Sequence, residues 1–554
     1  MAAFVATGCA AARALVAPPP CAALDARPTA SAFAGTPLRS ARAVVVCAAA
    51  PAPAAHSGYG VAMAADAATG AAKEPVVPVL MGSKADLPRC QKIADELAAF
   101  GIRAELHISS AHKTPERLIA MVRAYEADGR PKVYIAVAGR SNALSGMLDC
   151  AVTSPVISCP PYSDAFGGTD LYSSIRMPSG VAPALVLDPS GAALLAAKIL
   201  GVTNRGMAAK VGALQKANRD RLYFDDADTQ SRTYLPTIAE RRTGENGSCM
   251  IESNLDIGSN SRSGKVRDAY ELDDETLLLV TTDRQSAFDR VLAAVPYKGQ
   301  VLNLTSAYWF SVTEDIIPNH MLSVPHPNAL LARKCDPFPV EFVVRGYITG
   351  STDTSLWKNY AAGSRDYCGL SLPEGLVKNQ KLDANVLTPT TKDDAGDRPI
   401  SPAEIVSLGL MSQADADTCA EAALALFARG QALAAERGLI LVDTKYEFGR
   451  DSDGTIRLID EIHTPDSSRY WVAATYAARM AAGKEPENVD KEFLRLWFAD
   501  ACDPYKDEVL PEAPADLVDE LSRRYVMLYE IITGKPFEFG PSADSKTVRA
   551  SLPQ

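Results

Sequence analysis

Short apolar runs alternate with amphipathic stretches from about residue 73 onward. Residues 87–100 place their apolar side chains on one side of a predicted helix, and a further helix is expected at about 190–200. Five apolar runs bounded by turn residues predict strands: PVVPVLMG, AELHIS, KVYIAVAG, PVISCPP and APALVLD. Strands that alternate with helices predict a parallel sheet with helices on both faces, which is a three-layer α/β domain.

The pattern changes in the second half of the chain. Periodicity weakens from about residue 225, and a linker is expected over residues 229–247. Beyond it, two apolar strands meet at an acidic turn, and a long helix is expected around residues 415–437. The segment DSDG, residues 451–454, joins two later strands as a hairpin turn does. This mixture of antiparallel strands and helices predicts an α+β domain.

Length and composition agree with this division. A chain of 554 residues is expected to form two or three domains, and 47% hydrophobic residues are enough for several cores. We place the first domain at residues 73–228, the second at 248–540 and a tail at 541–554. The net charge of −11 argues against nucleic-acid binding, and no long apolar run outside the N-terminal region predicts a membrane span. The 11 cysteines lack C-x-x-C pairs, which indicates a reducing compartment.

Residues 1–72 differ in composition from the rest of the chain. Alanine, proline and serine dominate, and residues 1–70 contain four arginines and two aspartates but no lysine or glutamate. An arginine-containing, acid-poor leader is typical of organelle transit peptides. We therefore expect a disordered transit peptide that directs the protein to the plastid stroma, with the mitochondrion as the alternative. An unstructured tail with no targeting role is the competing interpretation.

The end of the first predicted strand is suited to binding a phosphate. Ser83 follows a glycine there and precedes a helix, so that backbone N–H groups and the helix dipole favour an anion. Ser83 can donate a hydrogen bond, and Asp86 can bind ribose hydroxyls or cap the helix. A turn of this composition is more often structural, so the motif gains weight only from its neighbours.

The second predicted strand ends at Ser110, His112 and Lys113. Because neighbouring parallel strands open their carboxyl ends onto one crevice, we expect Ser110 and Lys113 to join Ser83 around the same phosphate. His112 would then lie beside the ligand, and histidine is the side chain best suited to move a proton near neutral pH. A structural or solvent-exposed loop histidine is the competing interpretation.

Residues 76–228 resemble the aminoimidazole ribonucleotide carboxylase family, the flavodoxin-like enzymes of purine synthesis. The motifs MGSKAD, SAHKTPE and LYSSIRMPSG carry the resemblance. The segments AGRSNALSGM and ISCPP resemble the branch that uses CO2 directly, whereas the bacterial mutase branch has a GGAAHLPGM-like loop. The resemblance implies carboxylation of aminoimidazole ribonucleotide by CO2, without ATP or biotin. The alternatives are an N5-carboxyaminoimidazole ribonucleotide mutase and a non-catalytic scaffold.

The implied reaction assigns roles to residues of the first domain. The electron-rich ring carbon attacks CO2, and the adduct must lose a ring proton to regain aromaticity, so His112 is the candidate for that transfer. The carboxylate would be held by the loop residues Gly139, Arg140, Ser141 and Asn142. For Arg140, a structural ion pair is the alternative.

The second domain opens with a different phosphate motif, Gly264-Lys265-Val266-Arg267. Glycine allows a backbone loop to cover phosphates, and the two basic side chains supply positive charge. The motif parallels the glycine loop of kinases but is not a Walker A sequence. A solvated basic strand is the competing interpretation.

Two carboxylates fall on the two strands of the predicted hairpin. Glu447 lies on the first strand and Asp460 on the second, so that paired strands can bring both to one Mg2+ ion, which prefers oxygen ligands. Lys445 alternates onto the same face as Glu447 and can contact nucleotide or substrate anions. A pair of surface acids is the competing interpretation.

Residues 248–540 resemble the SAICAR synthetase family. The motifs GKVRDAY, TTDRQSAFD, VVRGYITGS, DTKYEFG and DEIHTPDSSR carry the resemblance. It implies an α+β fold of the ATP-grasp or kinase-like kind. It also implies ligation of carboxyaminoimidazole ribonucleotide to L-aspartate with ATP and Mg2+, through an acyl phosphate.

This second resemblance also assigns site residues. The residues assigned to bind the ATP phosphates are Gly264, Lys265, Val266 and Arg267. Glu447 and Asp460 are assigned to bind Mg-ATP. The residues assigned to bind the substrate phosphate are Arg345, Ser351 and Arg469. The residues expected to line the same cleft are Asp283, Ser286 and Asp289. Lys392 is placed on a mobile loop near aspartate, and Lys445 is the candidate catalytic residue. For Asp443, a purely structural role is the competing interpretation.

The two resemblances imply consecutive reactions, because the carboxylase product is the synthetase substrate. We therefore expect a bifunctional enzyme of purine biosynthesis with small-molecule substrates and no nucleic-acid or membrane partner. The carboxylase family assembles as an octamer, so a homo-oligomer formed through the first domain is expected. A protein-kinase-like phosphotransferase belongs to another class, and the chain has no HRD or DFG motif.

Overall fold

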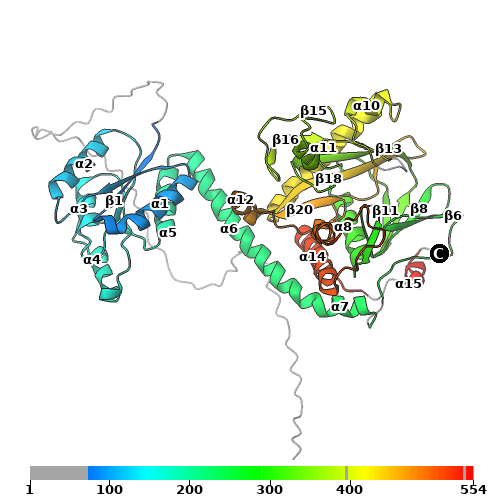
Figure 1. Ribbon diagram of the computed structural model, residues 1–554, viewed down its shortest axis with the longest axis horizontal. Coiled ribbons are helices and arrows are strands. Elements are labelled where there is room, and N and C mark those ends of the chain that lie inside the picture. Colours follow the sequence, from blue (N-terminus) through cyan, green and yellow to red (C-terminus); the bar gives the residue numbers. More distant parts are fainter. Residues whose placement is uncertain are drawn as a thin grey trace, which may run out of the picture. The chain divides into compact units, whose positions relative to one another are not determined.

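The computed structural model describes residues 73–245, 248–288, 290–352, 354–392, 397–540 and 544–552. The predicted transit peptide, residues 1–72, lies outside the described residues. Figure 1 shows an N-terminal α/β part in blue and cyan and a C-terminal part of mixed sheets and helices in green to red. Within the described ranges, no helix combines the length and the hydrophobicity that a bilayer-spanning segment requires.

The N-terminal part is built on a parallel sheet, as predicted. Its five strands have the order β2-β1-β3-β4-β5, the flavodoxin-like order, and all pairings are parallel. The strands are β1 Val76–Met81, β2 Arg103–Ile108, β3 Tyr134–Val137, β4 Val156–Ser158 and β5 Ala184–Leu185. The helices are η1 Lys84–Asp86, α1 Leu87–Ala99, α2 Pro115–Ala127, α3 Ala143–Ala151, η2 Asp164–Phe166, η3 Thr169–Leu171, α4 Tyr172–Ile175 and α5 Pro189–Gly201.

Side chains of β1 are divided between two apolar cores. Val77, Val79 and Met81 pack with α1 and α5 on one face of the sheet, whereas Leu80 packs with α2 and α3 on the other. Because successive strand residues point to opposite faces, one strand supplies both cores. The result is the predicted arrangement of helix, sheet and helix in three layers.

The C-terminal part contains two larger sheets, with orders β11-β12-β8-β7-β6 and β16-β13-β18-β19. In the second, β17 pairs with β13 and β20 pairs with β18. The strands are β6 Asn260–Ser263, β7 Arg267–Glu271, β8 Thr276–Thr281, β9 Arg284–Ala287, β10 Arg290–Ala294, β11 Met321–His326, β12 Ala329–Arg333, β13 Asp336–Tyr347, β14 Asp366–Tyr367, β15 Leu370–Ser371, β16 Lys381–Leu387, β17 Thr390–Thr391, β18 Leu439–Arg450, β19 Ile456–Ile459 and β20 Ser468–Val472. The helices are α8 Lys298–Val312, α9 Leu356–Ala361, α10 Pro402–Ser407, α11 Gln413–Glu436, α12 Ala473–Ala481, α13 Glu492–Ala501, α14 Ala515–Thr533 and α15 Ser545–Ala550.

The sequence anticipated the main pairings of this part. Strands β7 and β8 are antiparallel, and β18 and β19 form the hairpin predicted from DSDG. Gly454 in that turn has a φ of 83°, a left-handed conformation that glycine adopts without strain. Long antiparallel strands packed against helices give the predicted α+β architecture.

The stretch expected to be a linker is largely helical. Helix α6, Arg205–Ser231, is followed by the 3-10 turn η4, Arg232–Tyr234, and by α7, Leu235–Thr243. Ile238 of α7 is fully buried in one core with side chains of α8 and α14. Residues 229–243 therefore fold with the C-terminal part and do not form an extended connection.

Part of the expected tail packs on the first sheet. Val548 of α15 is fully buried beside Tyr270, Leu278 and Val280 of β7 and β8. The Ser545 hydroxyl donates a hydrogen bond to the Ser253 carbonyl. Helix α15 thus covers a face of the sheet whose strands β6 and β7 flank the glycine motif.

Two histidines of the C-terminal part are buried. His320 is 4% exposed and lies edge-on to Phe310, and His463 is fully buried between Trp309 and Tyr446. Burial lowers the pKa of each histidine to about 3. Both imidazoles are therefore neutral in the folded protein near neutral pH.

Replacing Ile238 with alanine is expected to destabilise the C-terminal part by about 2–5 kcal/mol, because it leaves a cavity at a fully buried position. Glu240→Ala, on the exposed side of the same helix, is the matched control and should cost under about 0.5 kcal/mol. Urea unfolding followed by tryptophan fluorescence measures the difference. This signal reports on the C-terminal part, because that part contains all four tryptophans of the chain: Trp309, Trp357, Trp471 and Trp497. Equally small effects for both variants would contradict the packing of α7.

Lowering the pH from 7 to 5 is expected to cost about 2 kcal/mol of unfolding free energy for each buried imidazole. The folded-state pKa of about 3 lies below the unfolded value of 6.5. The unfolded chain therefore binds more protons in this window, and stability falls as the pH falls. His320→Phe keeps a ring against Phe310 and should remove one such contribution. Urea unfolding at both pH values checks this, and an undiminished pH dependence in the variant would refute it.

Candidate active sites

The predicted residues of the first site lie at one edge of the parallel sheet. Met81 at the end of β1 pairs with Ile108 of β2 and with Val137 of β3. One loop begins after each of these three strand ends. Because the strand ends are in register, the structure brings these loops together. They carry the predicted residues Ser83, Asp86, Ser110, His112, Lys113, Gly139, Arg140, Ser141 and Asn142.

Local hydrogen bonds shape the first two of these loops. Asp86 accepts hydrogen bonds from the backbone N–H and the hydroxyl of Ser83, both at 3.1 Å, and so completes a capping box. The Ser110 hydroxyl accepts from the Lys113 N–H at 3.3 Å. This turn leaves His112 and Lys113 exposed at the sheet edge, where a ligand can reach them.

Asn142 holds the third loop in place. Its amide group, 2% exposed, donates to the hydroxyls of Ser158 at 2.7 Å and Ser174 at 2.9 Å. Its carbonyl oxygen accepts from the Ser145 N–H at 3.3 Å and caps α3. The side chain of Asn142 therefore organises the loop, and the exposed groups of the loop are those of its neighbours Arg140 and Ser141.

Arg140 on the same loop has a left-handed backbone conformation with a φ of 62°. Its N–H donates to the Asp170 carboxylate at 2.9 Å, which holds the conformation. Such a backbone is uncommon for a residue with a side chain and is maintained only by surrounding contacts. The exposed side chain of Arg140 is accordingly fixed at its base and open at its charged end.

In the synthetase part, three neighbouring strands bring Asp443 between two arginines. Arg345 of β13 lies opposite Asp443 of β18, which lies opposite Arg469 of β20. The Asp443 carboxylate is 3.3 Å from Arg345 Nη1 and 2.7 Å from Arg469 Nη1. Asp443 therefore holds two of the predicted phosphate-binding residues side by side.

Ser351, the third predicted phosphate-binding residue, reaches this group through Glu492. The Ser351 hydroxyl donates to Glu492 Oε1 at 2.6 Å, and Arg469 Nε lies 3.5 Å from Glu492 Oε2. Arg495 Nη1 is 3.4 Å from the same oxygen. Burial raises the pKa of Glu492, but the charges of Arg469 and Arg495 bring it down to about 2. These contacts join the predicted phosphate site to α13.

A second group of charges surrounds the ammonium of Lys445. Its Nζ lies 3.3 Å from Glu341 and 3.3 Å from Asp460, and it also donates to Glu447. Burial lowers the pKa of Lys445, but these carboxylates raise it well above its usual range. The two carboxylates predicted to bind metal thus converge on one cation.

Two further cations complete this charged cluster. Arg267 forms an ion pair with Asp460, and Lys392 forms one with Glu447. Burial raises the pKa of Asp460, but Lys445 and Arg267 hold it well below its usual range. Asp460 has a φ of 66°, so its backbone is strained where its carboxylate enters the cluster.

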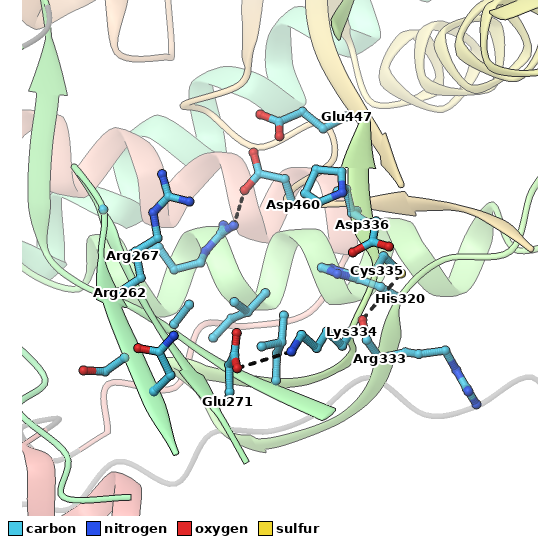
Figure 2. Close-up of a pocket in the computed structure, with 18 of the residues that line it drawn as sticks. Arg262, Arg267, Glu271, His320, Arg333, Lys334, Cys335, Asp336, Glu447 and Asp460 are labelled. Carbon is cyan, nitrogen blue, oxygen red and sulfur yellow. Dashed lines mark hydrogen bonds and ion pairs between the residues drawn. The ribbon is translucent and has the colours of Figure 1, made fainter. Parts of the chain in front are cut away.

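Two pockets adjoin at the ion pair of Arg267 and Asp460, since both residues line each pocket. The first pocket has a volume of about 570 Å³ and extends from the glycine motif to residues 334–337. The second has a volume of about 360 Å³ and contains the pair of arginines around Asp443. Figure 2 shows the first pocket, with Arg267 reaching toward Asp460 and Glu447 beyond it.

Most of the predicted synthetase residues line these pockets. The first pocket is lined by Gly264, Arg267, Lys392, Glu447 and Asp460. The second is lined by Lys265, Val266, Arg267, Ser286, Arg345, Lys445, Asp460 and Arg469.

Asp283 does not lie in the cleft predicted for it from the sequence. Its carboxylate accepts from the backbone N–H groups of Met250 at 2.8 Å and Gly299 at 2.9 Å, and its side chain is buried. Burial raises the pKa of Asp283. These contacts fix the start of α8, and Asp283 lines neither pocket. Asp289, expected in the same cleft, lies outside the described residues.

The charged residues that were not predicted from the sequence include Glu461, Lys491 and Arg495, which line the second pocket, and Glu341, which contacts Lys445. Glu341 lies four residues before Arg345 on β13, so alternation along that strand was an available signal. Lys491 and Arg495 come from the start of α13 and line the second pocket. Burial, followed by the charge of Arg495, lowers the pKa of Lys491 to about 8.

The carboxylates present suit a metal ion that arrives with phosphates. Among the residues whose positions are described, no group of three or more His, Cys, Asp or Glu side chains is arranged to hold a metal. Glu447 and Asp460 offer two hard oxygen ligands that already converge on a cation. Mg2+ is commonly held by one or two carboxylates together with substrate phosphates, and the pair fits that pattern.

Comparison with known proteins assigns both parts of the chain. The family model described as SAICAR synthetase matches residues 260–512, and that described as AIR carboxylase matches residues 76–221. A phosphoribosylaminoimidazole-succinocarboxamide synthase of Legionella pneumophila (strain Lens) is 63% identical over 291 residues, 52% of this chain and 93% of the relative. A chloroplastic synthase of the same description from Arabidopsis thaliana is 57% identical over 336 residues, 60% of this chain and 80% of the relative.

Solved structures are also similar in sequence. SAICAR synthase from Saccharomyces cerevisiae in complex with SAICAR is 34% identical, with a TM-score of 0.45, and covers 52% of this chain and 99% of its own. PurE of Treponema denticola is 50% identical, with a TM-score of 0.27, and covers 28% of this chain and 97% of its own. The family models and the high identity to whole synthases decide the assignment. The chain belongs to the SAICAR synthetase family, carries an AIR carboxylase domain ahead of the synthetase domain, and is a bifunctional enzyme of purine biosynthesis.

Proposed function

We propose that the two adjoining pockets of the synthetase domain bind the two nucleotides of its reaction. The first pocket takes ATP, on which SAICAR synthetases depend. The second takes carboxyaminoimidazole ribonucleotide, with its phosphate on Arg345, Ser351 and Arg469. One observation carries this proposal: the ion pair of Arg267 and Asp460 lines both pockets, and so lies where an ATP phosphate would meet a substrate carboxylate.

The chemistry follows from this adjacency. An oxygen of the ring carboxylate attacks the γ-phosphorus of ATP, and ADP leaves with the electron pair of the broken bond. The amine of L-aspartate then attacks the carbon of the acyl phosphate, and phosphate leaves as the amide forms. Lys445 and Arg267 offset the charge on the transferred phosphoryl group. Mg2+ held by Glu447 and Asp460 would add positive charge at the phosphates.

Lys392 is proposed to serve the aspartate step. It pairs with Glu447 on the wall of the ATP pocket, immediately before residues 393–396. Lys491 and Arg495 add positive charge to the second pocket, which has to hold a phosphate and several carboxylates. An excess of cationic side chains is what substrates of this charge require.

For the N-terminal domain we propose direct carboxylation of aminoimidazole ribonucleotide by CO2. The AGRSNALSG loop supports the CO2-using reaction, and the shared sheet edge supports one site that contains Ser83, Ser110 and His112. His112 takes the ring proton that the carboxylated intermediate must lose. The N5-carboxyaminoimidazole ribonucleotide mutase is the alternative, because both reactions need a phosphate site and a proton-transfer residue.

The proposal includes a plastid location and a homo-oligomer. Relatives from Arabidopsis thaliana and Vigna aconitifolia, 57% and 59% identical, are named chloroplastic, and the acid-poor leader agrees with the plastid stroma. A mitochondrion is the alternative. Ile108, Tyr172 and Ile175 of the carboxylase domain are 45%, 62% and 53% exposed. Exposed apolar side chains in one domain favour assembly through it, and we propose an octamer.

The purified enzyme is expected to carboxylate aminoimidazole ribonucleotide with CO2 in the absence of ATP. His112→Asn should lower this rate by about 10²–10⁴-fold, because the ring proton loses its acceptor. The synthetase activity of the same sample is the internal control and should be unchanged. Turnover of N5-carboxyaminoimidazole ribonucleotide without use of CO2 would identify a mutase, and a fully active His112→Asn enzyme would remove the proposed role.

Asp460→Asn is expected to lower the synthetase kcat by about 10²-fold and to raise the Mg2+ concentration required, because one charged oxygen ligand is lost. ADP release at saturating substrates, titrated with Mg2+, measures both effects. Asp453→Asn makes the same chemical change at an exposed position of the β18–β19 turn and serves as the control. Wild-type kcat and Mg2+ dependence in Asp460→Asn would exclude the metal role.

A further inference from the structure

His463 is a buried histidine that the proposed chemistry does not use. It lies between β19 and β20, on the segment that begins with Asp460 and leads to Arg469. Its ring centroid is 4.6 Å from that of Trp309 and 5.5 Å from that of Tyr446. The side chain is fully buried and lines neither of the two pockets described above. Its role must therefore be exerted through its neighbours.

One hydrogen bond connects this segment to β18. The Tyr446 hydroxyl and His463 Nε2 are 2.5 Å apart. Tyr446 stands between Lys445 and Glu447, and strand alternation directs its ring into the core while those two side chains face the pockets. The bond therefore joins the back of the strand that carries Lys445 to the segment that presents Asp460.

Both partners of this bond are neutral. Burial lowers the pKa of His463 to about 3 and raises the pKa of Tyr446 well above its usual range. A neutral imidazole and a phenol can share one hydrogen between Nε2 and the hydroxyl oxygen, whichever of them donates it. The bond is thus compatible with the whole pH range in which an enzyme of this kind works.

The backbone of the segment needs such a contact. Asp460 and His463 both have left-handed conformations, with φ values of 66° and 52°. Residues with side chains keep such conformations only where surrounding structure holds them. The tyrosine bond and the tight packing of the ring provide that support close to Asp460.

Helix α11 makes room for the imidazole on its other side. A Cβ atom at Gly430 would lie 2.4 Å from Cε1 of His463. Glycine is disfavoured relative to alanine inside a helix, so its presence in the middle of α11 calls for a packing reason. The space that Gly430 leaves for the ring supplies that reason.

We propose that His463 is a positioning residue of the synthetase, which sets Asp460 relative to Lys445 through its hydrogen bond to Tyr446. The proposal rests on the roles proposed above for Lys445 and Asp460. Loosening this link displaces groups that act on the transferred phosphoryl group. It leaves in place Arg345 and Ser351, which are proposed to bind the substrate phosphate from other elements, and Arg469 stays paired with Asp443 of β18. The rate of the chemical step is therefore affected more than substrate binding.

Tyr446→Phe tests the link by removing a single oxygen atom. The kcat of the full-length enzyme is expected to fall roughly tenfold, since small misplacements of reacting groups are costly. The KM for carboxyaminoimidazole ribonucleotide should stay within about twofold. Gly430→Ala, which pushes on the imidazole from the opposite side, should give the same division between kcat and KM.

Tyr360→Phe is the matched control. The buried Tyr360 hydroxyl donates to the Pro373 carbonyl at 2.8 Å, and Tyr360 lines neither synthetase pocket. The control should lower thermal stability by an amount similar to Tyr446→Phe while leaving kcat and KM unchanged. Rates are measured well below each unfolding transition, with the carboxylase activity of the same sample as the reference for protein amount.

The possible outcomes separate this inference from the proposal beneath it. An unchanged kcat in Tyr446→Phe, or equal losses in Tyr446→Phe and Tyr360→Phe, would overturn the positioning role. An active Asp460→Asn enzyme would remove the role of Asp460 itself. An inactive Asp460→Asn enzyme together with a fully active Tyr446→Phe enzyme would remove the positioning inference alone.

Discussion

Strand β18 changes the face that it presents to the core partway along its length, and the synthetase site depends on that change. Near its start, Leu441 packs in the main core, whereas farther along Tyr446 and Phe448 do so. The pairing register with β20 shifts between Leu441 and Asp443. A shift of this kind re-aims the side chains that follow it. Asp443 and the alternate residues after it consequently face the pockets, although strict alternation from Leu441 would have buried them.

The charged side chains on this face of β18 contribute little to the free energy of unfolding. Buried ion pairs lose hydration that their mutual attraction seldom outweighs, so a dense set of them is a weak source of stability. Asp443 is surrounded by two arginines, and Lys445 by three carboxylates, within one small region. Such a concentration in a pocket indicates a site whose composition was set by its ligands. The apolar side of the same sheet supplies the stability that makes the arrangement possible.

The sequence predicted elements where one local pattern decided the structure, such as the parallel sheet and the DSDG hairpin. It failed where distant contacts decided it. Residues 229–247 show little periodicity because α7 buries few side chains, among them Ile238, yet those contacts make it part of the core. Asp283 stands in a motif of the site but serves the backbone of Met250 and Gly299. Lys491 reaches the second pocket from a helix whose place no nearby pattern reveals.

The internal pairing of charges around Lys445 has a consequence for which ligands the pockets accept. A lone anion would meet Glu447 and Asp460, and a lone divalent cation would meet the positive charges of Arg267 and Lys392. Either ligand would have to separate an existing ion pair, and it could offer a new partner to only one of the two charged side chains. A ligand that carries both a positive and a negative charge can offer a new partner to both side chains of an ion pair. Selectivity for a ligand that carries both charges, over its separate ions, therefore follows from the pairing of charges around Lys445.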